Sequence, residues 1–296
     1  MEPYKIKHIL IPVDFSETSL LALEHGTFMA KLFKVNITLV HVIETYTIKI
    51  DFPEISFGNK QNISSLIEDK LEELAATVKH ETGGNVDILV KTGKIAKKIV
   101  ETAKEVNASL IIMGTHGTSG IEEFFVGSNA YRVVTESDCP VISVQTHVKK
   151  IGFSNILLPI DDSKHSREKA RYVVEIAKHY NSKIHIAGIL NTDDKETLRK
   201  FKIKIEQVEH YLKKHDILYT TEMLHGNNVA DVALKEAKRI KADLIAVTTE
   251  QDYDVTGLFI GPSAQQVVNH SKIPVMSIKP LFNPEGYNVP MFTSST

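Results

Sequence analysis

The sequence predicts an α/β protein made of two tandem domains, each an open sheet of five parallel strands with helices on both faces. The first observation behind this prediction is an internal repeat, whose period is about half of the 296-residue chain. The second is that each half alternates short, almost continuously apolar segments with amphipathic ones. This alternation is typical of parallel strands that crossover helices bury on both faces.

Three segments of the first half recur in the same order in the second half. A repeat of this length indicates a duplicated domain, because solenoid repeats have periods of roughly 20–50 residues. The matched pairs are HILIPVDFSETSLLAL (8–23) with NILLPIDDSKHSREKA (155–170), ASLIIMGTHG (108–117) with ADLIAVTTEQ (242–251), and FFVGSNAYRVVTESDCPVISV (124–144) with LFIGPSAQQVVNHSKIPVMSI (258–278).

We expect a first domain at residues 1–148, a second at 149–281 and a C-terminal tail at 282–296. The boundary falls in QTHVKKIGFS (145–154), which we interpret as a short polar joint. The tail contains Pro, Gly, Ser and Thr without hydrophobic periodicity, so we expect it to be ordered only where it docks on another surface.

Hydrophobic periodicity and end signals predict the elements of each half. Ser16 is placed to cap the first helix, and Gly83-Gly84 closes the second. In the first half, strands are expected at 8–14, 35–44, 85–93, 108–114 and 139–145, and helices at 16–33, 63–83, 94–107 and 129–137. The second half repeats this order, from NILLPID (155–161) to IPVMSIK (273–279).

Composition excludes several classes of function. The formal net charge of −2 provides no general basic field for nucleic acid or an anionic membrane, and no apolar run reaches the roughly 18 residues that span a membrane. The single cysteine, Cys139, excludes an internal disulfide framework and a multi-cysteine zinc site. MEPYKIKHILIPVDFS lacks the pattern of a secretory signal, so we expect a cytoplasmic protein.

A glycine-containing loop follows the fourth strand. Gly114 and Gly117 would let the backbone turn tightly and approach a ligand, and Gly127-Ser128 opens the next helix. The free N–H groups and positive dipole end of that helix suit a phosphate. Asp14 ends the first strand at the same sheet edge, where a carboxylate can accept the hydroxyls of a ribose.

Less specific interpretations remain open for these residues. The two loop glycines fit ordinary turns, Asp14 fits a helix-capping carboxylate, and His41 fits a core histidine. The chain has neither a Walker A loop nor G-x-G-x-x-G, and no Ser-His-Asp order, HExxH or paired-carboxylate spacing stands out. We therefore assign no catalytic residue and no metal-ligating residue.

The segments ILIPVDFSETS (9–19), ITLVHVIE (37–44), ASLIIMGTHG (108–117), VGSNAYRVV (126–134) and CPVISV (139–144) resemble a universal stress protein domain, and the duplication resembles the tandem members of that family. The resemblance covers both halves without the tail. It implies a Rossmann-like sheet of order 3-2-1-4-5, and ATP binding in members with the full signature G-x2-G-x9-G-[S/T]. Gly114, Gly117, Gly127 and Ser128 match that signature fully.

The resemblance also implies how ATP would be held. Asp14 would meet the ribose, with Pro12 and Val13 beside it. The backbone of Val42 would read the adenine edge, and Met113 would pack near the base and ribose. The phosphates would be held by Gly114, Gly117, Gly127, Ser128 and Asn129. A magnesium ion could bridge the phosphates, since no dedicated carboxylate cage is visible.

The second half departs from the signature. Gly114 aligns with Thr248, Gly117 with Gln251 and Ser128 with Pro262. Side chains at the two glycine positions would crowd a phosphate, proline removes a hydroxyl and a backbone donor, and Asp254 adds negative charge. We therefore expect one ATP site per chain, in the first half. A different, less charged ligand in the second half stays an alternative.

The exposed edge of each predicted sheet indicates how the two halves pair. Members of the family pair through the fifth strand, so the two halves are expected to form an intramolecular pseudo-dimer; further homo-oligomerisation is left open. The leading function is an ATP-binding stress-response or signalling protein that acts on an unknown protein partner, with at most slow ATP hydrolysis. The alternative is a nucleotide-independent interaction or scaffold protein that uses the pseudo-dimer surface. We see no basic or nucleophilic set for an adenylate-transferring enzyme.

Overall fold

The computed structural model describes residues 2–44, 60–115, 126–146, 148, 150–249 and 261–280. The predicted tail and Gly117 lie outside these residues. Elements of the first half are β1 (His8–Pro12), α1 (Glu17–Phe33), β2 (Asn36–Ile43), α2 (Lys60–Thr82), β3 (Val86–Thr92), α3 (Ile95–Glu105), β4 (Leu110–Gly114), α4 (Ser128–Glu136) and β5 (Val141–Val144). Those of the second half are β6 (Asn155–Ile160), α5 (Ala170–Tyr180), β7 (Lys183–Ile189), α6 (Lys195–Lys214), β8 (Tyr219–Leu224), α7 (Val229–Arg239), β9 (Leu244–Thr248), α8 (Pro262–His270) and β10 (Val275–Ile278).

Over the described residues, ten strands form one sheet of order β3-β2-β1-β4-β5-β10-β9-β6-β7-β8. Each half therefore has the predicted order 3-2-1-4-5, and the strands within a half are parallel. This confirms the predicted fold class of two tandem Rossmann-like α/β sheets. The chain runs outward across the sheet from β1 to β3 and then crosses to place β4 on the other side of β1, so the carboxyl ends of β1 and β4 flank a topological switch point.

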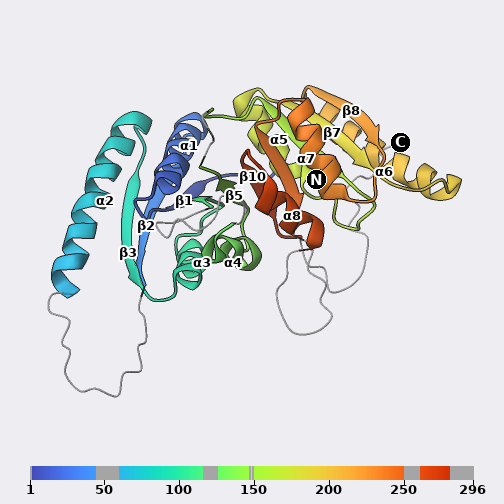
Figure 1. The fold of residues 1–296 in the computed structure, drawn as a ribbon. Helices are drawn as coiled ribbons and strands as arrows, with labels where there is room; N and C mark the ends of the chain where they lie inside the picture. The colour runs from blue at the N-terminus through green and yellow to red at the C-terminus, as the bar shows by residue number, and fades with distance from the viewer. Residues whose placement is uncertain are drawn as a thin grey trace, which may run out of the picture.

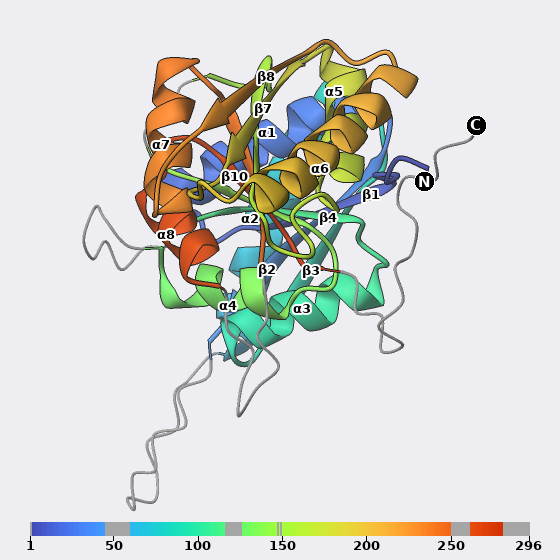
Figure 2. The same ribbon diagram turned by 90° about the vertical axis from the view of Figure 1, so that its right-hand side faces the viewer.

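The halves are joined edge to edge through their fifth strands, as predicted for a pseudo-dimer. β5 and β10 are antiparallel, with Val275 opposite Ser143 and Met276 opposite Ile142. The Ser143 hydroxyl also donates to the Val275 carbonyl at 3.3 Å. In Figure 1 the two strands lie between the halves, and Figure 2 views the molecule from the end that carries the second half. The pairing satisfies sheet edges that would otherwise be open.

The buried core is divided by sheet face rather than by half. One cluster joins apolar residues of α1 and α2 to those of α5 and α6, and it runs through strands of both halves. The other cluster lies under α3, α4, α7 and α8 and likewise includes residues from both halves. The sequence predicted two tandem domains, and the structure shows that each apolar cluster includes residues of both halves.

Local signals set the helix ends where they were expected. Ser16 is the N-cap of α1, and its side chain accepts a hydrogen bond from the Ser19 N–H. Gly83, just past α2, has a φ of 67° and donates its N–H to the Lys79 carbonyl at 2.9 Å. A positive φ of this kind is readily adopted by glycine, so the residue ends the helix at little conformational cost.

The joint between the halves is less polar than its sequence indicates. Phe153 is only 1% exposed, and its ring lies 5.7 Å from the His25 ring and 5.3 Å from the Tyr180 ring, which come from the two halves. The prediction of a plain polar joint was wrong in this respect, because one aromatic residue of the joint fills the interface between α1 and α5.

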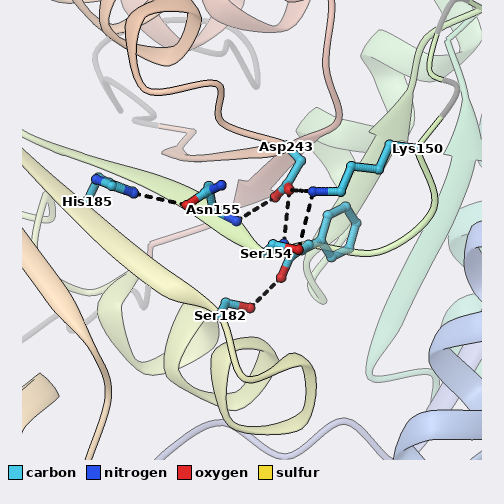
Figure 3. Close-up of polar contacts among 7 residues, drawn as sticks. Lys150, Ser154, Asn155, Ser182, His185 and Asp243 are labelled. Carbon is cyan, nitrogen blue, oxygen red and sulfur yellow. Dashed lines mark hydrogen bonds and ion pairs between the residues drawn. The ribbon is translucent and has the colours of Figure 1, made fainter.

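Polar contacts anchor the rest of the joint at the amino ends of the second-half strands (Figure 3). Asp243 accepts hydrogen bonds from the N–H groups of Ser154 and Asn155, at 3.0 and 2.9 Å. The Lys150 ammonium pairs with the same carboxylate at 2.6 Å. In the first half, Ser109 takes the equivalent position and accepts from the N–H of Lys7 at 2.7 Å. The second half thus replaces a hydroxyl with a carboxylate that also fixes the joint.

Candidate functional site

A cavity of about 300 Å³ opens at the carboxyl ends of β1, β2 and β4 and at the amino end of α4. It lies at the switch point where ligands bind in open α/β sheets. The structure brings nine of the ten predicted site residues together around it: Pro12, Val13, Asp14, Val42, Met113, Gly114, Gly127, Ser128 and Asn129. The tenth, Gly117, falls outside the described residues, and the role of all ten as ligand contacts stays a prediction.

Asp14 is held by the turn between β1 and α1. Its Oδ1 accepts hydrogen bonds from the N–H of Ser16 at 3.0 Å and from the Ser16 hydroxyl at 2.5 Å. Phe15, between them, has a φ of 63°, a conformation that is costly for a residue with a side chain and is often found at functional sites. Ser16 is the helix cap, so the interpretation of Asp14 as the capping residue was wrong, and Asp14 instead orients that cap.

Gly114 is required by the packing of α1 rather than by an approaching ligand alone. A Cβ at this position would lie 2.8 Å from the Thr18 carbonyl carbon and 3.0 Å from the Ser19 nitrogen. Both are backbone atoms at the start of α1, and they cannot move without displacing the helix. The glycine therefore allows the first turn of α1 to lie directly against the end of β4, on the border of the cavity.

The loop that leaves β4 returns to the same place. The N–H of Gly127 donates to the Thr115 carbonyl at 2.8 Å, and the N–H of Thr115 donates to the Val144 carbonyl at 3.0 Å. A Cβ on Gly127 would lie 3.0 Å from that Thr115 oxygen. The two ends of the loop are thus fastened to each other and to β5, which fixes the position of α4.

The amino end of α4 presents backbone donors to the cavity. Gly127 is its N-cap and has no side chain to cap the helix, and the first intrahelical bond runs from the Tyr131 N–H to the Gly127 carbonyl. The N–H groups of Ser128, Asn129 and Ala130 therefore have no partner within the helix. All three residues line the cavity, where these donors and the helix dipole favour an anion.

The opposite wall is apolar and includes residues that sequence reasoning missed. These are Val40 on β2, and Ile95 and Ile99, which are one helical turn apart at the start of α3. Ser19, Glu44, Thr115 and Ala130 also line the cavity and were not predicted. The sequence predicted a helix at 94–107, but nothing in the sequence alone directed a face of that helix to this cavity.

His41 does not line the cavity but contacts the turn that holds Asp14. Its Nδ1 lies 2.7 Å from the Val13 carbonyl oxygen, and because a carbonyl only accepts, Nδ1 carries the proton. The ring also stacks on Phe15, with the ring centroids 5.3 Å apart. The interpretation of His41 as a satisfied core histidine agrees with this geometry, which fixes the turn that holds Asp14.

The charged side chains on the described walls are both acidic. Asp14 and Glu44 line the cavity, and no lysine or arginine is among the lining residues that the structure describes. An anionic ligand would therefore depend on backbone N–H groups and on an accompanying cation. Within the described ranges, no group of three or more His, Cys, Asp and Glu side chains is arranged to hold a metal ion by itself.

The equivalent place in the second half is much smaller, at about 80 Å³. Asp161, Thr248, Gly261 and Pro262 line it, at the positions of Asp14, Gly114, Gly127 and Ser128. Pro262 is the first residue of α8 and has no N–H to offer. A buried lysine, Lys169, also lines this pocket, and sequence reasoning did not single it out.

Comparison with known proteins places this geometry in one family. The sequence model of the universal stress protein family matches residues 5–145 and 152–279. Universal stress protein MJ0531 of Methanocaldococcus jannaschii is 33% identical over 147 residues, which cover 49% of this chain and 85% of that protein. Universal stress protein MJ0577 of the same organism is 32% identical over 153 residues, which cover 47% of this chain and 94% of that protein.

Solved structures match the whole tandem arrangement. A universal stress protein from Archaeoglobus fulgidus superposes with a TM-score of 0.74 and 21% identity, over 92% of this chain and 98% of that one. A structure from Pseudomonas aeruginosa has a TM-score of 0.70 and 16% identity, over 94% of both chains. At these identities the similarity establishes the fold. No helix among the described residues is long and apolar enough to cross a membrane.

Proposed function

The chain belongs to the universal stress protein family, as a member with two tandem domains, and we propose that its first half binds one ATP molecule per chain. One observation carries this proposal. The first-half cavity places the Asp14 carboxylate and the uncapped amino end of α4 on the walls of one space of about 300 Å³. A carboxylate and an anion site so arranged suit the ribose and the phosphates of one nucleotide.

The phosphates would lie against α4. The N–H groups of Ser128, Asn129 and Ala130 are donors that the helix leaves unused, and the Ser128 hydroxyl adds another. Because Asp14 and Glu44 are the charged groups on the described walls, we propose that ATP enters with Mg²⁺, which neutralises phosphate charge. The backbone of Gly114, Gly117 and Gly127 would complete the phosphate site.

The nucleoside would occupy the side of the cavity nearer the strands. Asp14 would accept the ribose hydroxyls, with Pro12 and Val13 beside it, while its Oδ1 stays fixed by Ser16. Val42 would read the adenine edge through its backbone, and Met113 would pack on the base and ribose. The apolar Ile95 and Ile99 supply a surface that fits the flat, largely apolar face of a purine.

We propose that the protein signals through this site, according to whether the site holds a nucleotide or is empty. Bound ATP would alter the surface around the site, and a protein partner in a stress response or signalling event would read that surface. No side chain on the described walls is assigned as a general base, so any hydrolysis would be slow. The alternative function is a nucleotide-independent scaffold, which the continuous ten-stranded pseudo-dimer favours.

Calorimetric titration of the intact chain tests the proposal. With Mg²⁺ present, ATP should bind more tightly than adenosine, because only ATP reaches the amino end of α4. Asp14→Asn keeps the acceptor for Ser16 but removes the charge, and it should weaken both ligands by about tenfold, which corresponds to about 1.4 kcal/mol. Glu17→Gln, on the exposed start of α1, is the matched control and should bind like the wild type. Absence of any ATP binding by nucleotide-free protein would leave the scaffold function.

A further inference from the structure

Lys169 is the least expected side chain in the second-half pocket. It is 4% exposed, and its ammonium group donates to the Ser166 hydroxyl at 3.2 Å. The internal repeat aligns Lys169 with Ala22, which is a buried residue of α1. A buried lysine is rare unless nearby groups compensate its charge, so the groups around Lys169 indicate its role.

Asp161, the counterpart of Asp14, lines the same small pocket as Lys169. Its backbone N–H donates at 2.9 Å to the Ser166 hydroxyl, which is also the group to which the Lys169 ammonium donates. Burial by itself would raise the pKa of the Asp161 carboxyl, but the positive charge of Lys169 and hydrogen bonds from Ser163 and Ser166 outweigh burial and leave the pKa below its usual value. The Ser163 hydroxyl donates to Asp161 Oδ1 at 2.6 Å. The carboxylate that would meet a ribose in the first half is therefore satisfied by the protein's own groups in the second.

The path of the chain before α5 brings Lys169 into this position. α1 begins at Glu17, whereas α5 begins only at Ala170, although the two segments are aligned repeats. The residues before α5 are wound in tighter turns, with bonds from the Glu168 N–H to the His165 carbonyl at 3.0 Å and from the Ala170 N–H to the Arg167 carbonyl at 3.1 Å.

The end of the neighbouring strand also differs between the halves, since Thr248 of β9 stands where β4 has Gly114. Gly114, its counterpart, lies so close to α1 that a Cβ would come within 3.0 Å of the backbone of Thr18 and Ser19. Thr248 carries that Cβ, so a helix starting at the same place cannot lie as close to β9. In the second half the chain forms the tighter turns here, and Lys169 lines the pocket together with Asp161.

We propose that Lys169 is the residue that closes the second half to nucleotides, because it places a buried positive charge beside Asp161 in the small pocket where a ribose would otherwise lie. This inference rests on the proposed role of Asp14 in the first half. It adds a determinant that the glycine signature does not contain: restoring the glycine loop alone leaves the second site closed, because the Lys169 side chain still lines the pocket beside the carboxylate.

The test restores the glycine loop of the second half in the full-length chain, once with Lys169 present and once with Lys169 replaced. The first variant carries Thr248→Gly, Gln251→Gly and Pro262→Ser, which copy the first-half loop. The second variant adds Lys169→Ala, since alanine is the residue at position 22, and the control instead adds Lys178→Ala, at an exposed lysine of α5. ATP with Mg²⁺ is titrated calorimetrically into each, and the first-half site serves as an internal check that the protein is folded.

The proposal expects one ATP per chain for the wild type, for the loop variant and for the Lys178→Ala control, and two for the variant with Lys169→Ala. Two ATP molecules bound by the loop variant with Lys169 intact would overturn it, as would one bound by the Lys169→Ala variant. Failure of the proposed function gives a different result, since the wild type itself would then bind no ATP.

Discussion

Asp14 and Asp161 stand at equivalent strand ends but have different surroundings. Each receives the N–H and hydroxyl of the serine two residues later, so the local turn is the same. Only Asp161 has a buried lysine beside it, and only Asp14 faces the larger cavity. The two carboxylates therefore share the same local turn, and the difference between the two pockets lies in the residues around them, which in the second half include Lys169, Thr248 and Pro262.

Ser128 gives the most selective test of the phosphate site at this scale. Ser128→Pro should weaken ATP binding by about 10- to 100-fold, because it removes a backbone donor and a hydroxyl that are each worth about 1 kcal/mol or more toward a charged ligand. Helix α4 should be unaffected, since Pro262 opens α8 and the preceding glycines have nearly the same dihedral angles, with φ of −56° and −55°.

Ser128→Ala, which removes only the hydroxyl, should cost less affinity than Ser128→Pro. Calorimetric titration with ATP and Mg²⁺ measures both variants, and circular dichroism checks the fold. Equal affinity of Ser128→Pro and the wild type would mean that the amino end of α4 does not bind the phosphates.

His25 makes the stability of the fold depend on pH. It is 2% exposed, neither ring nitrogen has a hydrogen-bond partner, and burial lowers its pKa from 6.5 to about 4. Because the folded state favours the neutral ring, its contribution is complete above pH 6.5 and is lost as the pH falls toward 4. The free energy of unfolding should drop by roughly 1.4 kcal/mol per pH unit across most of that window.

Urea unfolding between pH 4 and 7 measures this dependence. His25→Phe keeps a ring to stack on Phe153 and should flatten the profile relative to the wild type, whereas His80→Phe, at an exposed position of α2, should not. An unchanged slope in His25→Phe would show that other groups cause the acid sensitivity.

At the scale of elements, the contact between α1 and β4 decides the shape of the first-half cavity. Gly114→Ala should destabilise the protein by about 1–3 kcal/mol, because the added methyl group meets backbone atoms of α1 that have no room to move. Gly84→Ala is the matched control, since a Cβ there makes only ordinary contacts, at 3.6 Å, and the change should be nearly neutral. Urea unfolding of the two variants compares them; equal stability would contradict the packing role of Gly114.

The same contact shows what sequence could and could not predict. The order of strands and helices, the Ser16 cap and the position of Gly114 at the end of β4 followed from periodicity, local chemistry and the family signature. That Gly114 touches α1 could not be predicted, because the contact joins residues about a hundred positions apart. Lys169 was missed because KHSREKA has the polar pattern of a solvated helix start; its alignment with the buried Ala22 was the available signal.

At the scale of the whole molecule, the two halves share their cores. Each face of the sheet carries one apolar cluster that includes residues from both halves, and Phe153 of the joint lies between α1 and α5. The sequence indicated two domains, since it shows repeats and not contacts between them. The physical unit of folding is therefore expected to be the entire chain, and the boundaries at 148 and 281 stay predictions about sequence units.

Differential scanning calorimetry of the intact chain tests whether the two halves unfold together. The wild type should unfold in one transition, and saturating ATP with Mg²⁺ should raise the temperature of that whole transition, although it binds only the first half. A ligand stabilises every part that unfolds together with its site, by about 2.7 kcal/mol at a hundred times the Kd. Two transitions, of which ATP moves only one, would show that the halves unfold independently.

The number of ATP molecules bound by each chain is the most direct test of the account. Native mass spectrometry of the intact, nucleotide-free protein with ATP and Mg²⁺ would count them, with Asp14→Asn as the comparison. The account predicts one ATP per chain and a much smaller bound fraction in Asp14→Asn. Two ATP molecules per wild-type chain would contradict a closed second half, and none would contradict nucleotide binding by the first.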